Sequence, residues 1–275
     1  MPTRTDHADP ADHDQPAVSI TLLHGVGLAP GLFDELVDGL LDELADEPTG
    51  SSSTVVNVAV RRGYDGRSLP AETFDDLLAD VAAIVDRAAP TLLVGVSGGA
   101  TLALAAALSA MPGVVGVVAH EPLVGPLAAE LHALVSTSAA ALAASPEPAA
   151  ALAFVERLVG ADTWSRLPAE ARAFTERHVD AVQAEVPLFL AFAPSAEQLA
   201  ACAVPIVVTT GAASPPARHA AAVVLERLAG VTVRAVDGAG HLCHWERPAA
   251  FASIIRSALD PASDPAPDAR QERTT

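Results

Sequence analysis

The stretch that decides the fold is "TLLVGVSGGATLALAAAL", residues 91–108. Its first six residues are mostly apolar and include β-branched side chains, which is typical of a strand buried on both faces. Gly-Val-Ser-Gly-Gly follows at 95–99, and a run of Ala and Leu then favours a helix. The pattern predicts a strand, a sharp turn that holds Ser97 in a strained conformation, and a helix. The alternative is a glycine-rich connection that binds a phosphate or only packs.

Strand-like and helix-like segments alternate on both sides of this stretch. Consecutive rather than alternating apolar residues predict strands that are covered on both faces. Strand, helix, strand at this rhythm predicts a parallel sheet with right-handed crossovers. The strand-like runs are 18–23, 53–60, 91–96, 114–119, 205–210 and 231–236; the helical patterns are 31–46, 71–89, the run after Ser97, 215–230 and 247–259.

The rhythm breaks between residues 123 and 202, where only helical patterns occur. This interval is too long for a single crossover, so we expect a helical cap inserted between two strands. The predicted organisation is an α/β core formed by residues 17–122 and 203–259, with a cap at 123–202. The ends, 1–16 and 260–275, are rich in Pro, Asp and Ala, and we expect disordered tails there.

Composition excludes several function classes. The formal charge is −18, from 34 acidic and 16 basic residues, which argues against binding nucleic acid. Two cysteines form neither a disulfide framework nor a metal-ligand spacing. The first residues lack the apolar core of a signal peptide, and no apolar run has the length of a membrane span. We expect a cytoplasmic protein that acts on a small molecule, with no cofactor or metal and with homo-oligomerisation left open.

The sequence His24-Gly25-Val26-Gly27 directly follows the strand at 18–23. A backbone N–H at such a strand end can point at the oxygen of a substrate attacked by Ser97. Together, the N–H groups of Val26 and Gly98 would form an oxyanion hole. Taken alone, the tetrapeptide reads as a turn that ends a strand.

The last predicted strand ends in "VDGAGHLCHWERP", residues 236–248. His241 lies in its glycine-rich part, at the edge of the sheet where a general base can reach Ser97. His244 is the competing residue, but it lies closer to the last helix and is better explained by packing.

These pieces, "HGVG", "GVSGG" and "GAGH", resemble the α/β-hydrolase family in order and in their flanking strands. The resemblance covers residues 17–259 and includes "RRGYDGRS" at 61–68, which is similar to a common loop of that family. It implies Ser97 as nucleophile, His241 as base, and Val26 and Gly98 as oxyanion donors. It also implies an α/β-hydrolase sheet, of which about six parallel strands are expected here, with a helical cap after the fourth.

The sequence departs from the family where the triad acid is usually found, just after the strand at 205–210. That loop begins Gly211-Ala212-Ala213-Ser214, and no Asp or Glu occurs from 204 to 225. Glu121, at the end of the strand 114–119, is the expected replacement, as in the haloalkane dehalogenases of this fold. Asp237 is the other candidate, although it precedes His241 by only four residues. A Ser–His dyad is the remaining alternative.

The expected activity is that of a serine hydrolase that cleaves a small or medium apolar ester through an acyl-enzyme. The same residues would suit a carbon–carbon bond hydrolase, a lactonase or a cofactor-free haloperoxidase. A non-catalytic binding protein that keeps the fold is the alternative from another class.

Overall fold

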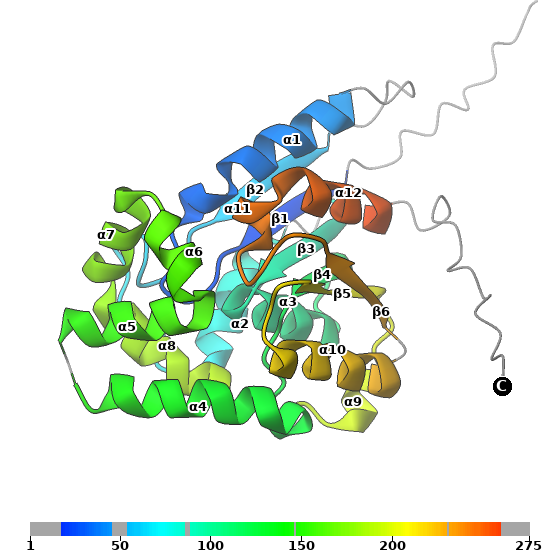
Figure 1. The fold of residues 1–275 in the computed structure, drawn as a ribbon. Helices are drawn as coiled ribbons and strands as arrows, with labels where there is room; N and C mark the ends of the chain where they lie inside the picture. Colours follow the sequence, from blue (N-terminus) through cyan, green and yellow to red (C-terminus); the bar gives the residue numbers. More distant parts are fainter. Residues whose placement is uncertain (1–17, 46–53, 86–88, 146, 230, 260–275) are drawn as a thin grey trace, which may run out of the picture.

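The computed structural model describes residues 18–45, 54–85, 89–145, 147–229 and 231–259 (Figure 1). The tails predicted at 1–16 and 260–275 lie outside the described residues. Among the described residues, no helix is long and apolar enough to cross a membrane.

A single six-stranded sheet, parallel throughout, forms the centre of the fold, which confirms the predicted α/β architecture. The strand order is β2-β1-β3-β4-β5-β6. Strands β1 and β3 are buried along their whole length, as their continuous apolar sequences predict. The strands are β1 (Ser19–Leu23), β2 (Val55–Ala59), β3 (Thr91–Val96), β4 (Val114–His120), β5 (Ile206–Gly211) and β6 (Thr232–Val236).

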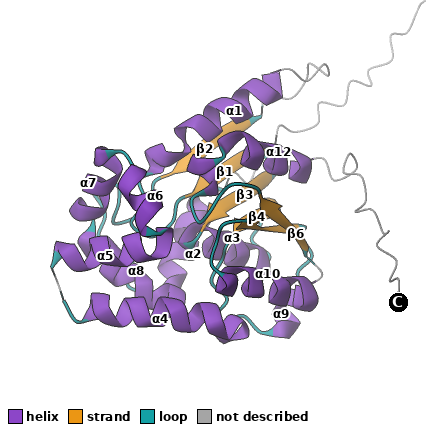
Figure 2. Ribbon diagram, viewed as in Figure 1, coloured by secondary structure: helices purple, strands orange, loops and turns teal. Residues whose placement is uncertain are grey.

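Helices cover both faces of this sheet (Figure 2). Neighbouring residues of a strand point to opposite faces, so Leu22 packs with Leu36 and Phe251 on one side while Leu23 packs with Leu102 on the other. The first face is covered by α1 (Asp34–Ala45) and α12 (Pro248–Leu259), with η1 (Pro30–Phe33) and α11 (Cys243–Glu246) beside them. The second is covered by α2 (Phe74–Ile84), α3 (Gly98–Leu108) and α10 (Pro216–Ala229).

The described residues between β4 and β5 form helices joined by turns and contain no strand. Their buried residues extend the second apolar cluster beyond the sheet. The helices are η2 (Gly125–Ala128), α4 (Ala129–Ala143), α5 (Pro148–Val159), α6 (Ala161–Arg166), α7 (Ala169–Arg177), α8 (Val179–Ala191) and α9 (Ala196–Ala200). We refer to α4–α8 as the lid.

Two glycines allow α3 to follow β3 without a gap. A Cβ on Gly95 would lie 2.2 Å from the carbonyl oxygen of Gly99, and a Cβ on Gly99 would lie 2.0 Å from the carbonyl oxygen of Leu23. Both obstacles are backbone atoms, which cannot move aside as a flexible side chain can. The close approach of β1, β3 and α3 therefore depends on the missing side chains.

We predict that Gly99→Ala lowers the free energy of unfolding by about 3 kcal/mol or more, because its methyl group must displace the end of β1. Urea unfolding followed by circular dichroism measures this change. Gly39→Ala is the matched control, since a Cβ there meets nothing within 4 Å. In α1 this control should stabilise the fold by up to about 1 kcal/mol. Equal stability of Gly99→Ala and the wild type would contradict the account.

Candidate active site

Ser97 occupies the predicted turn between β3 and α3. Its φ of 56° and ψ of −119° lie outside the regions that residues with a side chain normally adopt. The backbone on both sides holds this conformation: Ser97 N–H donates to the carbonyl of His120 at 2.9 Å, and Thr101 N–H donates to the carbonyl of Ser97 at 3.0 Å. A strained serine fixed in this way at a strand end is typical of a functional position.

The turn 24–27 lies directly against Ser97. A Cβ on Gly25 would lie 3.2 Å from Ser97 Cβ, and a Cβ on Gly98 would lie 2.9 Å from Val26 Cγ2. Among the described residues, neither Val26 N–H nor Gly98 N–H donates a hydrogen bond. Gly98 N–H also belongs to the positive end of α3. The structure thus brings together the two predicted oxyanion donors and Ser97.

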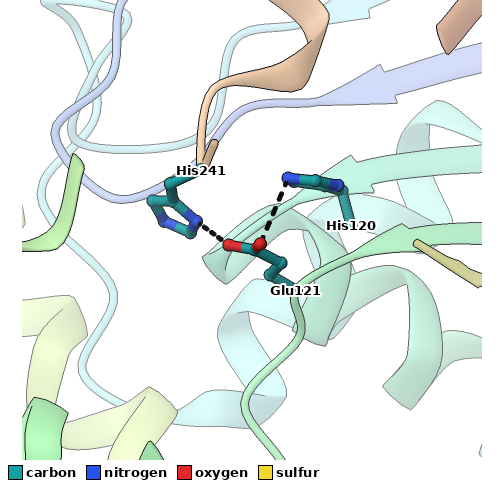
Figure 3. A group of neighbouring side chains, drawn as sticks. All are labelled: His120, Glu121 and His241. Atoms are coloured by element: carbon teal, nitrogen blue, oxygen red, sulfur yellow. Dashed lines mark hydrogen bonds and ion pairs between the residues drawn. The ribbon is translucent and has the colours of Figure 1, made fainter. Parts of the chain in front are cut away.

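His241 and Glu121 are in direct contact (Figure 3). His241 Nδ1 lies 2.6 Å from Glu121 Oε2, and both side chains are buried. An ionised carboxylate only accepts hydrogen bonds, so Nδ1 carries the proton and Nε2 keeps a free lone pair. Asp237, the other candidate acid, is exposed on the turn after β6. The structure therefore favours Glu121 as the partner of His241.

Glu121 is held from several directions. It lies at the end of β4 with a φ of 52°, and its own N–H donates to the carbonyl of Thr209 at 3.0 Å. The N–H of Gly211, in the loop where the family usually places its acid, donates to Glu121 Oε1 at 3.0 Å. From the end of β4, the Glu121 carboxylate thus reaches the loop after β5, where the family usually places its acid.

Arg218 of α10 is a site residue that the sequence analysis missed. Its Nε lies 3.1 Å from Glu121 Oε2, and its Nη2 donates to the carbonyl of Leu158 in the lid at 3.2 Å. Burial alone would raise the pKa of Glu121, but the charge of Arg218, aided by His120 and His241, holds it well below its usual value. The sequence indicates Arg218 only indirectly: a buried Glu121 carboxylate requires a cation nearby.

Burial and the charge of Arg218 act in the same direction on the imidazole. Together they lower the pKa of His241 to about 4, although Glu121 opposes them. The ring is therefore neutral at physiological pH, which is the state that a general base requires. His244, the competing histidine, is buried against Phe33 with ring centroids 4.4 Å apart, in keeping with a packing role.

His120, Glu121 and His241 offer possible metal-ligand atoms within 4.8 Å of one another. Their hydrogen bonds argue against a metal centre. His120 Nε2 contacts the carbonyl of Gly240 at 3.2 Å, so it carries the proton, and Nδ1 then accepts from the Thr209 hydroxyl at 2.9 Å. This ring has no free lone pair, and the cation Arg218 already contacts the carboxylate.

A small cavity lies between Ser97 and the lid. Its volume for a water-sized sphere is about 20 Å³, which is room for a single water molecule. Its wall is apolar apart from Ser97 and Arg218, and two aromatic side chains of the lid, Phe154 and Phe189, contribute to it. The lining residues are Val26, Ser97, Gly98, Leu123, Val135, Phe154, Leu158, Val186, Phe189 and Arg218.

Comparison with known proteins agrees with this architecture. The model of the alpha/beta hydrolase family matches residues 22–254. A search of curated proteins finds no significant match. Among solved structures, NosK from Streptomyces actuosus is 25% identical, with a TM-score of 0.63 over 90% of this chain and 100% of that chain.

Two further structures share the fold at lower identity. The enol-lactonase from Burkholderia xenovorans LB400 is 20% identical, with a TM-score of 0.69 over 90% of this chain and 93% of that one. The carboxylesterase CesB from Bacillus subtilis is 20% identical, with a TM-score of 0.62 over 92% and 85%. Since the family model spans the sheet, the lid and every segment of the site, the chain belongs to the alpha/beta hydrolase family.

Proposed function

We propose that the protein is a serine hydrolase that cleaves carboxylic esters through an acyl-enzyme. The observation that carries this proposal is a cavity lined by Ser97, Val26, Gly98 and Arg218, in which Arg218 also contacts the carboxylate that holds His241. Ser97 is held on a strained turn, the N–H groups of Val26 and Gly98 lie beside it without acceptors among the described residues, and His241 is hydrogen-bonded to Glu121. These features match nucleophile, oxyanion hole and oriented base.

In the proposed reaction, Ser97 Oγ attacks the ester carbonyl while His241 Nε2 accepts its proton. The carbonyl oxygen becomes negative, and the N–H groups of Val26 and Gly98 stabilise it. The intermediate then expels the alcohol, which takes the proton from His241, and leaves an acyl group on Ser97. Water attacks that acyl group by the same route in reverse and releases the acid. Glu121 keeps the imidazole oriented and stabilises its cationic form.

The substrate preference follows from the cavity wall. Val135, Phe154, Val186 and Phe189 line the cavity beside Ser97 with apolar side chains. An apolar acyl group loses little solvation there, whereas a charged group would have to be desolvated. We therefore propose a small or medium apolar acyl group. Because the cavity holds about one water, lid side chains must move apart to admit it.

Labelling with a fluorophosphonate probe tests the nucleophile. We expect one phosphonate per chain, on the peptide that contains Ser97, in folded wild-type protein. Ser97→Ala should remove both the label and the hydrolysis of short p-nitrophenyl esters. Absence of labelling in folded protein, or labelling of a different residue, would overturn the assignment.

Replacing the acid tests the role of Glu121. We expect Glu121→Gln to lower kcat about a thousandfold or more, because the amide can present its NH₂ to Nδ1 and favour the wrong tautomer. Asp237→Asn, the matched control on an exposed turn, should keep wild-type kcat. The reverse ranking would make Asp237 the acid.

Stability must be separated from catalysis in this comparison. Glu121→Gln leaves the buried charge of Arg218 without its anion, which is expected to cost about 3 kcal/mol of folding free energy. The double variant Glu121→Gln/Arg218→Met removes that charge. It should recover stability but not activity.

The pH dependence tests the state of His241. Since the pKa of His241 is about 4, kcat/KM should stay level as pH falls through 6.5 and reach half its plateau near pH 4. An ordinary histidine would give half-activity near pH 6.5. Protonation of His241 opposes folding as well, so brief assays after a pH jump, with circular dichroism at each pH, separate the two effects. Half-activity near pH 6.5 in folded protein would contradict the account.

A further inference from the structure

The turn that carries Val26 is held at the two residues that flank it. Gly27 N–H donates to the Tyr64 hydroxyl at 3.0 Å, and Arg61 Nη2 donates to the carbonyl of Gly25 at 3.2 Å. Val26 lines the cavity beside Ser97, and its N–H donates to no acceptor among the described residues. This N–H lies in the same peptide plane as the Gly25 carbonyl, which Arg61 holds together with His24 Nδ1 at 2.9 Å, while Tyr64 holds the next peptide. The direction of Val26 N–H therefore depends in part on two side chains of the loop after β2.

Both side chains donate a hydrogen bond to the same carboxylate, that of Glu185 in the lid. The Tyr64 hydroxyl donates to Glu185 Oε2 at 2.9 Å, and Arg61 Nη1 donates to Glu185 Oε1. Glu185 lies on α8 and is fully buried; Arg61 and Tyr64 are 4% and 3% exposed. A buried carboxylate that uses each oxygen for a different partner fixes both partners at once.

The Glu185 carboxylate also determines the donor and acceptor roles of the Tyr64 hydroxyl in the two hydrogen bonds it makes. Because the Tyr64 proton points to Glu185, its oxygen lone pairs are available to the Gly27 N–H. Burial, reinforced by the negative charge of Glu185, raises the pKa of Tyr64 well above its usual value, so the phenol keeps this proton. Without Glu185, the hydroxyl would be free to rotate and its contact with the turn would weaken.

The lid contacts the same turn at a second point. Thr175 of α7 donates its hydroxyl proton to the carbonyl of Gly27 at 2.7 Å. Helix α8 also supplies Val186 and Phe189 to the cavity wall, and a Cβ on Gly98 would lie 3.0 Å from the Phe189 ring. Helix α8 thus contributes part of the cavity wall and also Glu185, the carboxylate that fixes Tyr64 and Arg61 against the turn 24–27.

We propose that Glu185 is a positioning residue of the lid, which aligns Val26 N–H for the oxyanion through Tyr64 and Arg61. This inference rests on the proposed serine hydrolase. Catalysis would then depend on the position of α8. If the lid moves away from the sheet, Glu185 no longer holds Tyr64 and Arg61 against the turn 24–27. The oxyanion hole is then complete only while α8 covers the site.

Tyr64→Phe is the first test. It removes the hydroxyl but keeps the ring, which stacks on Phe174 with centroids 5.8 Å apart. We expect kcat for a short p-nitrophenyl ester to fall about 10- to 100-fold with KM changed less than about threefold, since the lost alignment acts on the transition state. Binding of a trifluoromethyl ketone, which forms an oxyanion on Ser97, should weaken by a similar factor.

The matched control breaks a neighbouring ion pair of the same loop. Arg62 Nε contacts Asp80 Oδ2 at 2.6 Å, and both side chains are about 30% exposed. Among the described residues, no hydrogen bond or ion pair joins either side chain to the turn 24–27. Asp80→Asn should leave kcat and ketone affinity within about twofold of wild type.

Substitution of Glu185 completes the experiment. Glu185→Gln leaves Arg61 buried without an anion, so it is compared with the charge-free pair Arg61→Met/Glu185→Gln, with circular dichroism reporting the fold. Glu185→Gln and Arg61→Met/Glu185→Gln, whichever of them folds, should show the same loss of kcat and ketone affinity as Tyr64→Phe. Wild-type kcat in Tyr64→Phe, or equal losses in Tyr64→Phe and Asp80→Asn, would overturn the positioning role. If Ser97→Ala keeps ester hydrolysis, the proposed function itself fails, whatever the Tyr64 result.

Discussion

The buried carboxylate of Glu121 is the interaction on which the arrangement of the site depends. Its two oxygens contact His241 on the loop after β6, the backbone of Gly211 at the end of β5, and Arg218 on α10. Its own backbone continues β4. An ionised group cannot remain in such a place without several partners, since each lost contact leaves desolvated charge uncompensated. The position of His241 is therefore set by electrostatics as much as by packing.

A second buried carboxylate, that of Glu185, contacts Arg61 and Tyr64, which hold the turn 24–27. Each of the two is paired with an arginine, and each joins the sheet to the lid: Arg218 also donates to Leu158, and Glu185 itself belongs to α8. Buried ion pairs add little net stability, but removing one partner is expensive, so they restrict the geometries available to the chain. In this protein, His241 and the turn 24–27 are each restricted in this way.

The sequence predicted the strands, the turn at Ser97 and the order of the site segments well, because these depend on local patterns. Glu121 could be inferred as the partner of His241 because the loop at 211–214 has no carboxylate and Glu121 ends a neighbouring strand, whereas Asp237 precedes His241 by only four residues. Arg218, Tyr64 and Glu185 were not assigned roles, although "RRGYDGRS" was recognised as a loop of the family. Their contacts join residues 37 to 124 positions apart in the sequence, which no local pattern encodes. The size of the cavity likewise depends on how the lid helices pack.

The most direct test of the account is mass spectrometry of protein quenched in acid during turnover of a p-nitrophenyl ester. The account predicts that the peptide containing Ser97 gains the mass of the acyl group, and that this mass disappears once the ester is consumed. Hydrolysis of the ester at the wild-type rate without acylation of Ser97, or with the acyl group on another residue, would contradict it.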